Sequence, residues 1–439
     1  MNVGFISLGC SKNLVDTEIV IGNFKDRKYN IVNNPKEADI IVINTCGFIE
    51  SAKEEAINTI LEMAQYKNNR CKYLIVMGCL VERYKEELEK AIPEVDLFIK
   101  FSEYDYLWDK IKELLPDEQS EFKNHNRLEN YINRVITSGN KTAYLKIAEG
   151  CSNRCTYCAI PYIRGPFVSR KFEDIIKEAK ELAKKGYEEI IVIAQDTAKY
   201  GIDLYGESRL AELLQELCNI NEIKWIRFLY AYPETITDEL ITVVKENDKI
   251  CNYFDIPLQH ISNPVLKRMN RKSNEQTIKE LIKKIRKEIP DAILRTSLIV
   301  GFPGETAGDF EKLYNFVEET EFDKLGVFMY SKEDGTPAEK LPNQVHSNTK
   351  KSRYNKIMKL QQDISTNKLK EKIGKDYEVL IETKTFDNKY LVGRTKMDVP
   401  EMDGLVYIRN DAKEDLINTF VICKIIDIMD YDLIGEIIS

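Results

Sequence analysis

The sequence has no uninterrupted run of about 18 apolar residues, the length that a membrane-spanning helix needs. Its first nine residues are apolar but have neither a basic flank nor a small-residue cleavage site, so we expect a first β-strand here and not a signal peptide. Basic charge is also scarce, because 64 Lys and Arg stand against 72 Asp and Glu, for a net charge of −8. This balance argues against a protein held on nucleic acid by bulk electrostatic attraction, although it allows a local basic groove.

Without a membrane span or a secretion signal, the protein is expected in the reducing cytoplasm. Disulfide frameworks are rare in that compartment, so clusters among the ten cysteines are better explained by metal binding or catalysis. The composition, 43% hydrophobic and 31% charged over 439 residues, is that of a globular protein with room for two to four domains.

The first part of the chain, residues 1–114, alternates strands and helices. Apolar runs at 3–8, 40–43 and 73–77 predict strands, and a helical pattern follows each of them. This alternation is typical of a parallel, doubly wound sheet, so we expect a flavodoxin-like α/β domain. Residues 115–140 are polar with little periodicity and are expected to form a linker.

A longer series of strand–helix units runs from residue 141 to about residue 340. Six apolar runs, at 143–148, 189–194, 225–230, 253–259, 293–300 and 325–330, predict an incomplete (β/α)6 barrel. A charged helix at 350–372 trails this core, so the second domain is expected to span residues 141–372. Residues 373–439 show short alternating runs separated by turn signals and predict a small antiparallel β-barrel.

Three cysteines with CxxxCxxC spacing, Cys151, Cys155 and Cys158, follow the first predicted barrel strand. Their loop lies at the C-terminal face of the barrel, where barrel active sites are found. Three thiolates on one tight loop can hold three irons of a 4Fe–4S cluster and leave the fourth iron open to a small molecule. The alternatives are unrelated buried cysteines or a zinc site, but zinc usually takes four protein ligands in paired CxxC units.

Cys10, Cys46 and Cys79 each follow a predicted strand of the first domain. Because the carboxyl ends of parallel strands meet at one edge of a sheet, we expect these thiols to lie together and to hold a second cluster. The remaining cysteines are expected to be structural: Cys71, which precedes the third strand and so belongs to the opposite edge, Cys218, Cys251 and Cys423.

The CxxxCxxC loop at the opening of a (β/α) barrel resembles the radical S-adenosylmethionine (SAM) superfamily. The resemblance implies that SAM chelates the open iron, and that reduction of the cluster cleaves SAM to a 5′-deoxyadenosyl radical. It also implies that the aromatic residue before the third cysteine packs near the adenine, and that glycines at 301–305 allow a close backbone approach to the cofactor. The expected cofactor contacts are Tyr157, Gln195, Arg295, Gly301 and Gly304.

Two three-cysteine sets and a terminal β-barrel together resemble the radical SAM methylthiotransferase family over nearly the full length. In that family the N-terminal domain binds an auxiliary cluster, and a C-terminal TRAM domain holds the macromolecular substrate. Some members modify a tRNA adenosine next to the anticodon, and others an aspartate of a small-subunit ribosomal protein. The strings that resemble the ribosomal-protein group begin at residues 8, 194, 257, 393 and 400: LGCSKNLVDTE, AQDT, PLQH, GRT and PEMDG.

The resemblance implies two 4Fe–4S clusters, and SAM both as methyl donor and as radical source. It further implies a small-subunit ribosomal protein as the substrate, free or within the ribosome, and a reductant protein such as flavodoxin or ferredoxin. A tRNA substrate is the alternative, and a purely structural zinc or iron–sulfur module is another. His260 ends a predicted barrel strand and is either a substrate-site residue or a structural histidine.

The terminal module carries 8 Lys and Arg against 14 Asp and Glu between residues 375 and 439. A module that grips tRNA should be basic, whereas an acidic one suits a basic ribosomal protein. Asp398, Glu401 and Asp403 lie in a turn-rich stretch, so we expect them to be surface acids that attract that partner. An ordinary solvated surface is the alternative.

Overall fold

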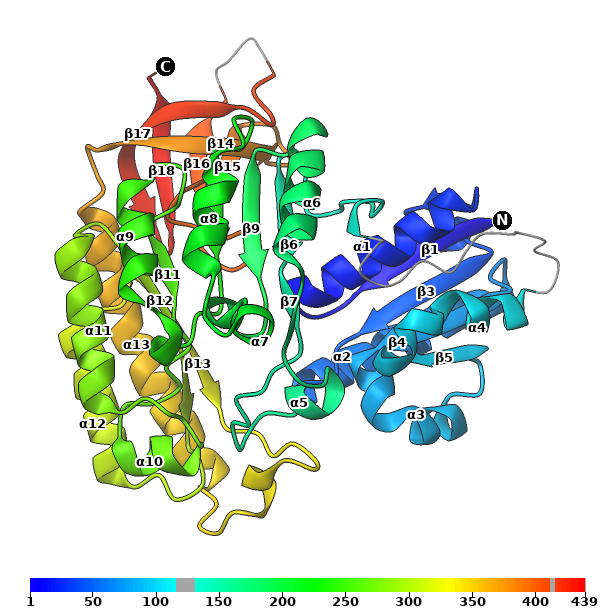
Figure 1. Ribbon diagram of the computed structural model, residues 1–439, viewed down its shortest axis with the longest axis horizontal. Coiled ribbons are helices and arrows are strands. Elements are labelled where there is room, and N and C mark those ends of the chain that lie inside the picture. The colour runs from blue at the N-terminus through cyan, green and yellow to red at the C-terminus, as the bar shows by residue number, and fades with distance from the viewer. Residues whose placement is uncertain (116–130, 411–414, 439) are drawn as a thin grey trace.

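The computed structural model describes residues 1–115, 131–410 and 415–438, which form an N-terminal α/β domain, a central open barrel and a small C-terminal barrel (Figure 1). Much of the expected linker, residues 116–130, lies outside the described residues. No helix of the described residues is both long and apolar enough to cross a membrane.

A parallel five-stranded sheet is the centre of the N-terminal domain. Its strands run in the order β2-β1-β3-β4-β5, with bounds Asn30–Val32, Asn2–Ser7, Ile40–Thr45, Tyr73–Gly78 and Leu97–Lys100. Helices cover both faces of the sheet: α2 (Glu50–Ala64) and α3 (Cys79–Ala91) on one, α1 (Ser11–Asp26) and α4 (Leu107–Leu114) on the other. Because both faces are covered, the central strands are apolar throughout, which confirms the doubly wound α/β fold.

Six parallel strands form an arc in the central domain: β6 (Thr142–Lys146), β9 (Glu189–Ile193), β10 (Trp225–Phe228), β11 (Tyr253–Asp255), β12 (Ile293–Val300) and β13 (Lys324–Met329). They pair as β10-β9-β6 and β11-β12-β13, and a parallel bridge between Ile226 and Ile250 joins the two sets. Within the described chain β6 and β13 do not pair, so the arc stays open as an incomplete (β/α)6 barrel.

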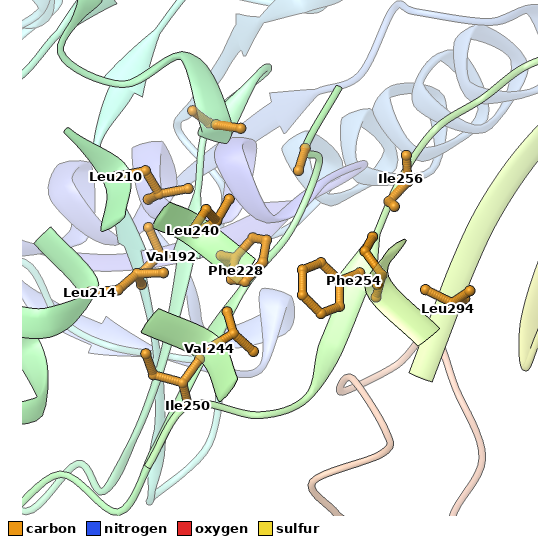
Figure 2. Close-up of a cluster of buried hydrophobic side chains, with 14 of the residues drawn as sticks. Val192, Leu210, Leu214, Phe228, Leu240, Val244, Ile250, Phe254, Ile256 and Leu294 are labelled. Carbon is orange, nitrogen blue, oxygen red and sulfur yellow. The ribbon is translucent and has the colours of Figure 1, made fainter. Parts of the chain in front are cut away.

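A layer of helices covers the outside of the arc: α6 (Phe172–Lys184), α8 (Leu210–Cys218), α9 (Asp238–Glu246), α11 (Glu275–Glu288), α12 (Ala307–Thr320) and α13 (Ser347–Lys370). Alternate strand residues point into this layer, and Figure 2 shows Phe228 and Phe254 at its centre, with ring centroids 5.6 Å apart. Since side chains alternate along a strand, the residues between them face the interior of the arc.

The C-terminal domain is a closed barrel with the strand order β14-β15-β16-β18-β17. Its strands are β14 (Asp376–Lys384), β15 (Tyr390–Thr395), β16 (Val406–Arg409), β17 (Phe420–Met429) and β18 (Asp432–Ile437). Every neighbouring pair is antiparallel except β16 and β18. The barrel covers the N-terminal ends of the central strands, away from the cysteine loop (Figure 1).

Buried ion pairs hold the C-terminal barrel in this position. The Arg394 guanidinium of β15 donates to Glu189, at the start of β9, over 2.6 Å and to Glu382 of β14 over 2.7 Å. Arg227 of β10 donates to the same Glu189 over 3.1 Å. Burial would raise the pKa of Glu189, but the two guanidinium groups outweigh it and lower the pKa to about 2.

Two of the three acids expected on a recognition surface belong to this interface instead. Asp398 accepts from Lys324 of β13 over 2.7 Å, and Asp403 accepts from the Tyr253 hydroxyl over 2.6 Å. Their side chains are 5% and 3% exposed. The expectation that these two acids attract a basic partner is therefore wrong, and only Glu401 is exposed.

Arg394→Met should destabilise the protein by about 3–5 kcal/mol, because it leaves the buried Glu189 with only one of its two cations. Denaturant unfolding measures the loss, and Lys389→Met, which removes an exposed cation of the same domain, should cost less than about 1 kcal/mol. Since the pKa of Glu189 lies below its ordinary value of 4.5, the Arg394 contribution should be complete above that pH and vanish as the pH falls towards 2. Equal losses in the two variants would contradict the interface described here.

Candidate functional site

Three cysteines lie at one edge of the N-terminal sheet. Cys10 directly precedes α1 after β1, Cys46 directly follows β3, and Cys79 begins α3 after β4. Because β1, β3 and β4 are parallel neighbours, these positions share the carboxyl edge, as the spacing predicts. Cys71 precedes β4 at the other end and is buried, with its thiol donating to the Tyr73 carbonyl over 3.3 Å.

Glycine is required at two positions where these three loops approach one another. Gly9 has φ +90°, and a Cβ there would lie 2.6 Å from the Cβ and 3.0 Å from the Sγ of Cys46. Gly78, with φ +107°, leaves room for Asn44, whose Oδ1 would lie 2.3 Å from an added Cβ. Only residues without a side chain let the strand ends approach this closely.

The Asn13 side chain ties the three strand ends together. Its Nδ2 donates to the carbonyls of Leu8 over 3.0 Å and Thr45 over 3.1 Å. Its Oδ1 accepts from the Cys79 thiol over 3.5 Å and from Arg164 over 2.5 Å. Sequence reasoning did not single out Asn13, although it lies three residues after Cys10 in the string at residue 8.

The electrostatics of this edge oppose three simultaneous thiolates. Burial, together with the charges of Cys10 and Cys46, raises the pKa of Cys79 to about 12. Burial also raises the pKa of Cys46. At the rim, desolvation of Cys10 is outweighed by Lys12 and Arg164, and the pKa of its thiol is lowered. A bound cation or metal cluster is the kind of partner that would hold all three sulfurs deprotonated.

The second set, Cys151, Cys155 and Cys158, lies on the loop between β7 (Ala148–Glu149) and α5 (Ile160–Ile163), beyond the C-terminal end of β6. Gly150 enters this loop with φ +72°, and a Cβ there would lie 2.1 Å from the Pro166 carbonyl. The C-terminal end of α10 (Asn263–Arg268) fixes the loop, because the Thr156 hydroxyl donates to the Arg268 carbonyl over 2.8 Å.

A buried cation lies against one of these sulfurs. The Arg271 Nη1 is 3.9 Å from the Cys155 Sγ, and its guanidinium lies 4.1 Å from the Tyr232 ring centroid. The Tyr232 hydroxyl is itself 3.7 Å from the same sulfur. Arg271 forms no ion pair with a carboxylate in the part of the chain that the structure describes, so an anionic Cys155 would compensate its charge. No sequence motif marked either residue.

Four of the expected cofactor contacts lie at the mouth of the barrel. The Tyr157 and Phe302 rings pack in a T-shaped arrangement with their centroids 6.4 Å apart. This contact joins the cysteine loop to residues 301–305. Gly301 and Gly304 have φ of +71° and +78°. Gln195 donates to Glu149 over 3.1 Å, while its Oε1 is buried and has no hydrogen-bond partner among the described residues. A buried unpaired acceptor at this position fits a polar ligand.

Arg295 contacts the neighbouring domain, and His260 is enclosed within the barrel. Arg295 donates to Asp255 over 2.7 Å and lies 4.0 Å from Asp403 of the C-terminal barrel. This position places Arg295 in the interface between domains and corrects the expectation of a cofactor contact. His260 is fully buried, its Nδ1 accepts from the Ser262 amide over 3.0 Å, and burial lowers its pKa to about 3, so it is neutral.

Buried charges connect the two cysteine sites. Arg164, which follows α5, donates to Asp16 of α1 over 3.0 Å and to Glu149 over 2.9 Å. Lys146 of β6 pairs with the same two carboxylates. The Arg164 and Lys146 side chains are 1% and 0% exposed. The carboxyl edge of the N-terminal sheet is thereby fixed beside the cysteine loop (Figure 1).

Comparisons with known proteins agree with this architecture. Residues 2–100 match a model described as Uncharacterized protein family UPF0004, residues 145–317 the radical SAM superfamily, and residues 373–438 the TRAM domain. The ribosomal protein uS12 methylthiotransferase RimO of Alkaliphilus oremlandii is 66% identical over 437 residues, which cover 100% of this chain and 99% of that protein. The chain belongs to the RimO methylthiotransferase family.

Other RimO proteins are similar over the same span. The protein so named in Clostridioides difficile is 51% identical, with 100% of this chain and 99% of that protein covered. The solved radical SAM methyltransferase TsrM of Kitasatospora setae is 11% identical with a TM-score of 0.57, over 77% of this chain and 75% of that one. This last likeness is one of fold. Membership of the radical SAM superfamily implies a 4Fe–4S cluster and SAM.

In the described part of the chain, no three His, Cys, Asp or Glu side chains already form a metal-binding group. Each cysteine set therefore shares an edge or a loop without being preformed as a ligand shell. Metal binding commonly completes such sites, because the ligands must lose their protons as they bind.

Arg164→Met should loosen the N-terminal domain from the barrel, because it leaves the buried Asp16 and the partly buried Glu149 with one cation fewer. Hydrogen exchange of the α1 and β6 amides should become faster, and the free energy of unfolding measured with denaturant should fall by about 3–5 kcal/mol. Arg70→Met removes a half-exposed arginine that pairs with Asp39 over 3.2 Å, and should change neither measurement appreciably. Unchanged exchange in Arg164→Met would show that these charges do not hold the domains together.

Proposed function

We propose that the protein methylthiolates an aspartate side chain of ribosomal protein uS12 by radical SAM chemistry. One observation carries the proposal: two separate sets of three thiols, on two domains, are held beside each other by Asn13 and Arg164. The names of the RimO relatives, which match over the full length, support the substrate. Such an arrangement suits a reaction that needs two adjacent clusters rather than one.

Each set of thiols would hold a 4Fe–4S cluster. Cys151, Cys155 and Cys158 are assigned to the radical-generating cluster, and Cys10, Cys46 and Cys79 to the auxiliary one. Three ligands for each cluster leave one iron open. Arg271 supports the first assignment, because its buried charge is compensated when Cys155 is a thiolate.

The mouth of the barrel would bind SAM. We assign Tyr157, Gln195, Gly301 and Gly304 to its binding, with the free Gln195 Oε1 as an acceptor. When bound, SAM and the clusters supply the methyl group and the one-electron chemistry. The residues of this chain bind and orient the reactants and exclude water from them.

The proposed domains are residues 1–114, which bind the auxiliary cluster, the linker 115–140, the radical SAM core 141–372 and the TRAM domain 373–439. We place the protein in the cytoplasm, acting on uS12 free or within the ribosome, with a reductant such as flavodoxin or ferredoxin. A tRNA substrate is disfavoured by the excess of acids in the TRAM domain, 14 against 8 basic residues.

Purified protein, reconstituted with iron and sulfide, should transfer a methylthio group to uS12 and not to anticodon-arm RNA. Mass spectrometry of both substrates measures the mass gain. A gain on the RNA alone would overturn the proposed substrate.

Variants that lack one or the other cysteine set should lose different activities. Replacing Cys151, Cys155 and Cys158 by Ala should remove about half of the iron and all SAM cleavage. Replacing Cys10, Cys46 and Cys79 should also remove about half of the iron, but should leave reductive SAM cleavage and abolish only the transfer. Cys71→Ala is the matched control for the second triple variant and should keep all the iron. Persistent SAM cleavage in the first triple variant would refute that assignment.

Gly9→Ala should selectively impair the auxiliary cluster, because its methyl group would displace Cys46. Iron should fall towards half while SAM cleavage persists. Gly139→Ala is the control: this residue also has a positive φ, +115°, but nothing lies within 4 Å of an added Cβ. Full iron content in Gly9→Ala would mean that the approach of these loops does not matter for the cluster.

A further inference from the structure

In the part of the chain that the structure describes, two buried cations lack a carboxylate partner. Ten Lys and Arg side chains are buried among the described residues, and eight of them have a carboxylate oxygen within 4.0 Å. The exceptions are Arg271 and Lys12. Arg271 contacts the sulfur of Cys155, one of the proposed cluster ligands. Lys12 is 7% exposed and has no such contact, which is rare because buried lysines are nearly always paired.

The contact that the Lys12 ammonium does make is with an aromatic ring. Its Nζ lies 3.2 Å from the centroid of Tyr230, two residues beyond the end of β10. A cation–π contact compensates only part of the cost of removing an ammonium from water. The site therefore has unsatisfied positive charge, and an anion that enters it would be bound.

The backbone fixes this ring at the barrel mouth. Tyr230 has φ +62°, which is a strained conformation for a bulky side chain. Its amide donates to Asp255 over 3.0 Å, and its carbonyl accepts from the Thr197 amide over 3.0 Å. Strain that the surrounding structure maintains is typical of ligand-binding positions.

Lys12 also lies between the two proposed cluster sites. It is two residues from Cys10 in sequence and lowers the pKa of that thiol, so it is close to the auxiliary set. Its contact with Tyr230 extends from the N-terminal domain to the mouth of the barrel, where the cysteine loop and residues 301–305 lie. An anion on Lys12 would therefore be presented to both sites.

We propose that Lys12 binds the carboxylate of the target aspartate and orients its neighbouring carbon between the two cysteine sites. The inference rests on the proposed function, which supplies a substrate that carries one carboxylate at the reacting side chain. Lys12 acts through its charge alone and transfers no atom to the substrate. It is thus a specificity residue, because an adenosine base has no negative charge to offer the buried ammonium.

The other carboxylate available at the mouth is that of SAM, and the test must distinguish the two. Lys12→Met keeps an unbranched apolar chain and removes the charge, whereas Lys12→Arg keeps the charge. Lys25→Met, an exposed cation on the same helix, is the matched control. The probes are purified uS12 and uS12 in which the target aspartate is changed to Asn.

With the reconstituted enzyme, Lys12→Met should weaken uS12 binding and raise the KM for uS12 by about 10- to 100-fold, the usual effect of losing a charged hydrogen bond. The KM for SAM, the iron content and SAM cleavage without uS12 should not change. Lys12→Arg should restore part of the affinity, and Lys25→Met should match wild type. Wild type should bind the Asn form of uS12 at least about 10-fold more weakly than uS12, and Lys12→Met should bind both forms alike.

Three outcomes would overturn the proposal. A rise in the KM for SAM alone would assign Lys12 to the SAM carboxylate. A loss of iron or a changed auxiliary-cluster spectrum would make it a counter-ion of that cluster. Unchanged uS12 binding in Lys12→Met would show that no carboxylate uses it. Absence of any transfer to uS12 by wild type would instead overturn the proposed function, and this inference with it.

Discussion

The buried ion cluster between α1 and the cysteine loop is the interaction on which the site depends. Asp16 of the N-terminal domain pairs with Lys146 and Arg164 of the barrel, all three nearly inaccessible to water, and both cations also pair with the partly buried Glu149. Buried pairs add little net stability, but a mismatched one is costly, so they select one relative placement of two domains. The two cysteine sets lie on different domains, and their separation is fixed only because this placement is unique.

Buried ion pairs also fix a domain at the opposite end of the barrel. Glu189 sits between Arg227 and Arg394, and the TRAM domain is thereby fixed over the N-terminal ends of the strands. A domain held by buried charges cannot swing freely towards a partner. Two of its acidic side chains also face the barrel and not the solvent, since Asp398 accepts from Lys324 and Asp403 accepts from the Tyr253 hydroxyl. The charge of the TRAM domain, counted from sequence, therefore overstates the acid that a partner meets.

The elements and site positions that depend on local pattern and strand topology could be predicted from the sequence. The run at 293–300 coincides with β12, and the strand-end rule brings Cys10, Cys46 and Cys79 to one edge. The short strands β2 and β5 were missed because three or four residues carry no clear period. Charge partners were missed because they are remote: Arg394 and Glu189 are 205 positions apart. A lumen-facing arginine such as Arg295 has the same local signal whether it binds a cofactor or a neighbouring domain.

The balance of buried charge then separates structural residues from functional ones. Wherever this protein buries a cation to join domains, as at Lys146 or Arg394, a carboxylate from another element meets it. Folding alone favours such pairing, because an uncompensated buried charge costs several kcal/mol. Lys12 and Arg271 break that rule, and both lie beside the cysteines assigned to clusters. Local rules are expected to fail at functional sites, where the missing partner is a ligand and not a residue. Among the described residues, the two buried cations without a carboxylate partner therefore support the proposed cluster sites independently of the cysteine spacing that first indicated them.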